Sequence, residues 1–174
     1  SFLMVLFLAI TARAQLLSYS NQFPGESSTF TITVDASFGN KGLFGNTPGD
    51  VYVHTGVITN LSNASLFWRY VKFNQDFNQP NPALQATSLG NNKWSFTITD
   101  VRNFYGVPAN EQILKIAILF RNGAGSKVQR NADGSDMFVP LYPAGLHVAL
   151  TSPFRQPTLV PIPEPIFKSV GQTV

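Results

Sequence analysis

The stretch Asp50-Val-Tyr-Val-His-Thr-Gly-Val-Ile58 alternates along the chain, with Val51, Val53, Thr55 and Val57 on one face. Such a period of two is typical of a β-strand with one buried face. Residues 29–35 alternate in the same way, whereas residues 113–122 are apolar on both faces and run into a Gly-rich turn. A strand that is apolar on both faces is typical of the middle of a buried sheet. We therefore expect this last strand at the sheet centre, with three residues in the core: Ile116, Ile118 and Phe120.

Shorter segments complete an all-β pattern. We expect strands at 66–73, 126–130 and 137–142, and a hairpin whose arms, 83–89 and 93–99, flank the turn Gly90-Asn-Asn92. Asp100 is a good N-cap for one helical turn over residues 100–106. Pro140 places the last strand at an edge or a bulge, because proline cannot donate to a sheet ladder. Short antiparallel strands separated by turns predict an Ig-like β-sandwich over residues 15–142.

The two ends of the chain differ from this middle part. Residues 1–14 have the apolar run and the Ala12-Arg-Ala14 cleavage pattern of a signal peptide that is truncated at its start. We expect the mature chain to begin at Gln15 and the protein to be secreted or held at a bacterial cell surface. The apolar run is shorter than the roughly 20 residues of a membrane span. Residues 143–174 are predicted to be a linker and the incomplete start of a second Ig-like β module.

Composition limits the classes of partner. Charged residues make up only 12% of the chain, and the net charge is +3 without any basic run, so we expect no nucleic-acid partner. The chain contains no cysteine, which excludes disulfides. A surface rich in Asn, Thr, Ser and Gln suits an extracellular protein that handles neutral ligands.

The titratable residues do not suggest catalysis. A glycosidase needs two carboxylates about 5 to 10 Å apart, and most of the nine acidic residues here fall in turns or at strand ends. The chain is also too short for a catalytic β/α barrel. Its two histidines, His54 and His147, lie in separate segments, which does not favour a zinc site. We expect no catalytic residues, no metal and no cofactor.

Aromatic and amide side chains are the candidates for weak carbohydrate contact. Tyr105, in the loop before Gly106, is the aromatic residue that we expect to be least buried. Trp68 is a second candidate, although the apolar alternation around it also fits a core position. The amides of Asn74 and Gln75 lie in an Asn-rich loop and complete the predicted site.

An ordered series of short motifs resembles a known module. The series comprises Val51-Tyr-Val-His-Thr-Gly-Val57, Trp68, Gly90-Asn-Asn-Lys-Trp94, Phe104-Tyr-Gly-Val-Pro108, Phe120-Arg-Asn-Gly-Ala-Gly125 and Asp133-Gly-Ser-Asp-Met-Phe138. It is similar to the N-terminal β-sandwich that precedes the catalytic barrel in secreted alpha-amylase-like proteins of the Bacteroidetes, which belong to glycoside hydrolase family 13. The similarity covers about residues 28 to 142.

The resemblance implies a role in binding or support. It predicts a non-catalytic accessory module that packs against neighbouring domains of the same polypeptide and can contact α-glucan. The alternative is a structural Ig-like spacer in a secreted or surface adhesin, without affinity for sugar.

Overall fold

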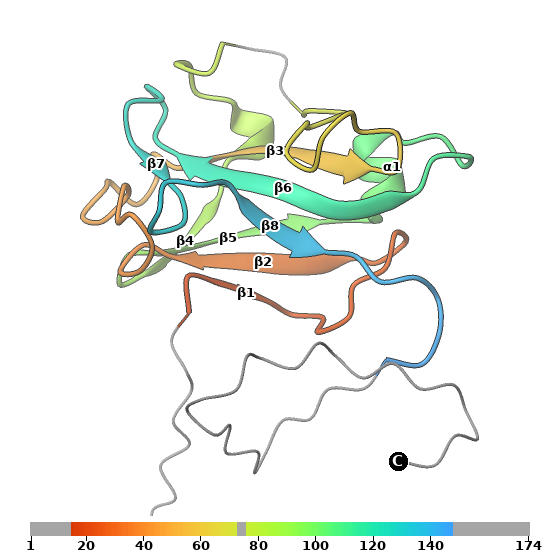
Figure 1. Ribbon diagram of the computed structural model, residues 1–174. Helices are drawn as coiled ribbons and strands as arrows, with labels where there is room; N and C mark the ends of the chain where they lie inside the picture. The colour runs from red at the N-terminus through yellow and green to blue at the C-terminus, as the bar shows by residue number, and fades with distance from the viewer. Residues whose placement is uncertain (1–14, 73–75, 148–174) are drawn as a thin grey trace, which may run out of the picture. The chain divides into compact units, whose positions relative to one another are not determined.

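The computed structural model describes residues 15–72 and 76–147 (Figure 1). The chain divides into two units, residues 1–144 and 145–174, and the fold is that of the first unit. Its elements are β1 (Leu17–Tyr19), β2 (Phe30–Asp35), β3 (Tyr52–Thr59), the 3-10 turn η1 (Pro82–Leu84), β4 (Thr87–Gly90), β5 (Lys93–Ile98), α1 (Val101–Tyr105), β6 (Ile113–Arg121), β7 (Val128–Gln129) and β8 (Met137–Pro140).

The strands form two antiparallel sheets that pack as a sandwich. One sheet has the order β1-β2-β5-β4. In the other, β6 lies between β3 on one side and both β7 and β8 on the other, because β7 pairs with one end of β6 and β8 with the rest. Figure 1 shows the long strands β3 and β6 side by side above β2 and β5. The predicted all-β sandwich and the central position of residues 113–122 are confirmed.

The core lies between the two sheets. Val53 and Val57 of β3, and Val51 just before the strand, point into it, as the alternation predicts. Ile116, Ile118 and Phe120 are fully buried, which confirms their predicted place in the core. Apolar residues of β2 and β5 close the core from the other sheet, and the largest of them is Trp94.

Local signals place the hairpin turn and the helix. Asn91 and Asn92 adopt positive φ, at 49° and 59°, between β4 and β5, as expected for residues that tolerate the left-handed region. The side chain of Asp100 accepts a hydrogen bond from the Asn103 amide (3.2 Å) and so caps α1. The helix ends at Tyr105, and its C-cap Gly106 is left-handed.

The strands differ from the prediction in three places, and some predicted segments lie outside the described residues. The strand expected at 66–73 is wrong over its described residues, 66–72. Tyr70 adopts a left-handed conformation (φ 50°), and among these residues only Arg69 forms a β-bridge. The first hairpin arm is shorter than predicted, since residues 82–84 form η1. Strand β1 lies in a segment for which the sequence predicted no strand. The predicted signal peptide at 1–14, and the residues from 148 onward that carry most of the second module, lie outside the described residues.

Candidate functional site

The segment after β3 lies along the sheet that contains β3 and β6. Arg69 and Val57 exchange two backbone hydrogen bonds, of 2.9 and 2.7 Å, and the Lys72 amide donates to the Thr55 carbonyl (2.8 Å). Gly56 permits this approach, because a Cβ atom there would lie 2.9 Å from the carbonyl oxygen of Arg69. The glycine of the motif Val51-Tyr-Val-His-Thr-Gly-Val57 therefore allows the segment that carries Trp68 to pack closely against β3.

The rings of Trp68 and Phe77 lie against His54, whose neighbours Val53 and Thr55 point into the core. The indole of Trp68 stacks on the imidazole, with ring centroids 5.4 Å apart and planes at 29°. Phe77 meets the same imidazole edge-on at 5.1 Å. Burial lowers the pKa of His54, and the positive charge of Arg121 lowers it further. We call His54, Trp68, Phe77 and Arg121 the outer-face cluster.

Arg121 is the buried cation of this cluster. Its guanidinium donates to the carbonyls of Gln79, Asn122 and Gly123 at 2.8 to 3.1 Å. It also lies over the Phe77 ring, 5.1 Å from the ring centroid. Carbonyl dipoles and an aromatic face compensate a buried cation. Arg121 therefore joins the loop before η1 to the turn after β6.

Glu111 is a buried carboxylate that anchors the segment on its other side. It accepts hydrogen bonds from the hydroxyls of Thr59 and Tyr70, the latter at 2.5 Å, and pairs with Arg69 at 2.8 Å. Burial by itself raises the pKa of Glu111, but these donors outweigh burial and hold the pKa below its ordinary value. The left-handed Tyr70 lies at this anchor, so the contact to Glu111 supports an uncommon backbone conformation.

The structure describes two of the four residues predicted to contact sugar, Trp68 and Tyr105. Trp68 is half-buried in the outer-face cluster. Tyr105 is only 3% exposed, so the expectation that it is the accessible aromatic residue is wrong. Its hydroxyl contacts Thr55 Oγ1 at 2.6 Å inside the core, and burial raises its pKa. Asn74 and Gln75 lie outside the described residues.

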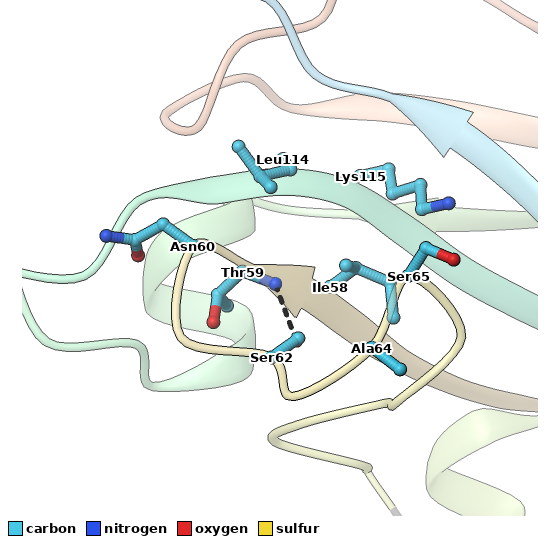
Figure 2. Close-up of a pocket in the computed structure, with 8 residues that line it drawn as sticks. All are labelled: Ile58, Thr59, Asn60, Ser62, Ala64, Ser65, Leu114 and Lys115. Carbon is cyan, nitrogen blue, oxygen red and sulfur yellow. Dashed lines mark hydrogen bonds between the residues drawn. The ribbon is translucent and has the colours of Figure 1, made fainter.

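Sequence analysis missed four exposed apolar side chains on the loop after β3 and on β6, which we call the apolar patch. Its members are Leu61 (54% exposed), Leu66 (61%), Phe67 (53%) and Leu114 (43%). The first three belong to the segment after β3, and Leu114 lies across from Ala64 and Ser65 in the pocket of Figure 2. The signal was available as Ser65-Leu-Phe-Trp68, but the strand predicted there assigned alternate residues to a core.

This face is amphipathic, since rings and aliphatic groups border hydroxyl and amide groups. Within residues 15–72 and 76–147, no group of three His, Cys, Asp or Glu side chains could hold a metal ion. Among the helices of the described part, none is long and apolar enough to cross a membrane. Neither a protein-family model nor a curated protein matches the sequence.

Proposed function

We propose that this sandwich is a non-catalytic accessory module of a secreted, alpha-amylase-like enzyme that degrades α-glucan, and that it packs against a neighbouring region of the same polypeptide. The observation that carries the proposal is the apolar patch of Leu61, Leu66, Phe67 and Leu114, each between 43% and 61% exposed. Exposed apolar groups that gather in one place, rather than singly, typically mark a surface that is covered in the working protein.

The patch is held in place. Arg69 and Tyr70, which follow it in the chain, are bound to Glu111, and Arg69 also pairs with β3. The loop therefore keeps its shape before any partner arrives, which reduces the entropy that binding costs. A fixed apolar surface on a loop supports an interface between modules better than it supports a solvated spacer.

The resemblance to alpha-amylase-like proteins supplies the identity of the neighbour. Several of its motif residues have structural roles here: Gly56 seats the Trp68 segment, Tyr105 fills the core and Arg121 joins two loops. The motifs thus favour the type of sandwich found in alpha-amylase-like proteins, and that type of sandwich favours the accessory role. Contact with polysaccharide is the finer part of the proposal.

The coding sequence downstream of residue 174 tests the role directly. A catalytic barrel of the alpha-amylase type supports the proposal. A series of further sandwich modules without a barrel contradicts it and supports the spacer of an adhesin.

A second experiment tests the interface. Phe67→Ser should weaken the association of this chain with the separately produced downstream region. The matched control is Leu89→Ser, which changes an equally exposed side chain (54%) on β4 in the other sheet. Equal effects of both variants would contradict the patch as the interface.

A further inference from the structure

A pocket of about 380 Å³ lies between the loop that follows β3 and the first residues of β6 (Figure 2). Its cause is a β-bulge. Ile58 pairs with Lys115 and Thr59 with Ile113, so Leu114 is the extra residue on β6. A bulge changes the direction of the side chains next to it, and Leu114 is accordingly 43% exposed at the pocket. The lining consists of Ile58, Thr59, Asn60, Ser62, Ala64, Ser65, Leu114 and Lys115.

The lining combines apolar and polar groups. Ala64 and Leu114 supply exposed aliphatic surface, whereas Ile58 is only 3% exposed and adds little. The side chains of Asn60 and Ser65 supply an amide and a hydroxyl. A small number of polar groups around an apolar surface is typical of small-molecule sites, and the volume falls within their usual range of about 300 to 1,000 Å³.

The walls are preformed. The Thr59 amide donates to Ser62 Oγ (3.0 Å), the dashed contact in Figure 2. Asn60 is tied to Gln112 in both directions, through its own amide (3.0 Å) and through its Oδ1 (2.9 Å). Gln112 contacts only the oxygen of the Asn60 side chain, so the Nδ2 group of Asn60 takes no part in this contact.

The charge at the pocket is compensated by an aromatic ring. Lys115 is the one charged side chain in the lining, and its Nζ lies 4.0 Å from the centroid of Phe138. A cation held over an aromatic face is stabilised there. Because the lining has no carboxylate, its other polar groups are neutral donors and acceptors, which suit a neutral hydroxylated ligand.

We propose that this pocket binds one glucose ring of an α-glucan chain. This inference rests on the proposed function and deepens it by placing the sugar contact. A pyranose ring presents aliphatic C–H groups on its faces and hydroxyls around its edge. The exposed aliphatic groups of Ala64 and Leu114 complement the faces. Asn60, Ser65 and Lys115 complement the hydroxyls. The exposed ring of Phe67, two residues beyond Ser65, offers apolar surface to the rest of the chain.

The test uses the whole chain, with maltohexaose as the probe and cellohexaose as the control sugar. In amide NMR spectra, maltohexaose should shift the signals of Ile58, Ser65 and Leu114. Ser65→Trp, which fills the pocket from an exposed position, should weaken binding by about tenfold or more, equivalent to about 1.4 kcal/mol. The matched control Thr87→Trp, on exposed β4, should leave binding unchanged. Affinity should hardly change between about 0.05 and 0.5 M salt, because the ligand is neutral.

Each outcome decides the matter. Shifts at the pocket with loss of binding in Ser65→Trp support the proposal. Binding of maltohexaose that shifts other residues, or that survives Ser65→Trp, overturns the pocket and leaves the accessory role intact. Equal shifts with cellohexaose overturn selectivity for α-glucan. Absence of any binding overturns the sugar contact, while the downstream coding sequence and the Phe67→Ser comparison still test the accessory role separately.

Discussion

The indole of Trp68 is stacked on the imidazole of His54, and this pair joins the segment after β3 to the strand itself. Because Phe77 contacts the same imidazole from another part of the chain, His54 connects two segments to one strand. The protonation state of a single side chain therefore bears on how the loops of this face are held.

We predict that the protein loses stability as the pH falls below about 6.5. Burial and the nearby Arg121 lower the folded-state pKa of His54, with Arg130 acting in the same direction and Asp136 opposing it. An unfolded histidine titrates near about pH 6.5. Between that value and the lower folded pKa the unfolded chain binds more protons, so stability is full above about pH 6.5 and declines below it.

Denaturant unfolding at about pH 7.5 and about pH 5.5 measures this effect. His54→Gln should reduce the difference between the two pH values, whereas His147→Gln, at the other histidine, should keep it. An unchanged pH dependence in His54→Gln would assign the effect to other groups.

We predict that Glu111→Gln lowers the free energy of unfolding by about 1 to 3 kcal/mol at neutral pH. The amide keeps the shape of the carboxyl group but cannot accept from Thr59, Tyr70 and Arg69 together. The matched control is Asp76→Asn, an exposed acid that should change stability little.

The stability difference between the parent protein and Glu111→Gln should also depend on pH in a predictable direction. Because the folded-state pKa of Glu111 is lowered, its contribution is complete above about pH 4.5 and is lost as the pH falls through the folded pKa. The gap between the parent and Glu111→Gln should therefore narrow in acid. A gap that widens in acid would contradict the lowered pKa.

Alternation predicted β2 and β3, because a period of two in the residues indicates which face of a strand points into the core. The unbroken apolar run of β6 predicted a strand at the sheet centre, and its burial on both faces agrees. The Asn91-Asn92 turn and the Asp100 cap were predictable because their chemistry is local. The strand at 66–73 was predicted wrongly because its apolar residues cover a sheet edge and form a surface patch.

Contacts between distant residues explain why the site was less predictable. Tyr105 is the last residue of a short capped helix, and whether it points inward depends on Thr55, which lies 50 residues earlier. Glu111 lies in a polar turn and carries no local sign of Arg69 and Tyr70, which are 42 and 41 residues away. The pocket depends on a bulge in the pairing of β3 with β6, and a register shift leaves no mark in either strand alone.

The hydroxyl pair of Tyr105 and Thr55 should behave as one unit in the core. Thr55 Oγ1 donates to the Ala117 carbonyl (2.8 Å) and contacts the Tyr105 hydroxyl at 2.6 Å. Tyr105→Phe should cost about 1 kcal/mol, and Thr55→Val about 1 to 3 kcal/mol because it leaves the buried Tyr105 hydroxyl without this partner. The double variant should cost less than the sum, which denaturant unfolding of all four proteins measures. Additive costs would show that the two hydroxyls do not depend on each other.

Alanine substitutions of Phe120 and Phe67 should differ in their effect on stability, because one side chain is in the core and the other is at the surface. Phe120 is fully buried at the centre of β6, and Phe67 is 53% exposed in the apolar patch. Phe120→Ala should lower the free energy of unfolding by about 3 to 5 kcal/mol, because it leaves a cavity between the sheets. Phe67→Ala makes the same chemical change at the surface and should cost no more than about 0.5 kcal/mol in the isolated chain. Denaturant unfolding of the two variants under the same conditions gives the comparison. A loss below about 1 kcal/mol for Phe120→Ala would contradict the position of β6 in the core. A loss for Phe67→Ala as large as that expected for Phe120→Ala would show that the patch stabilises the fold and is not a free surface for a partner.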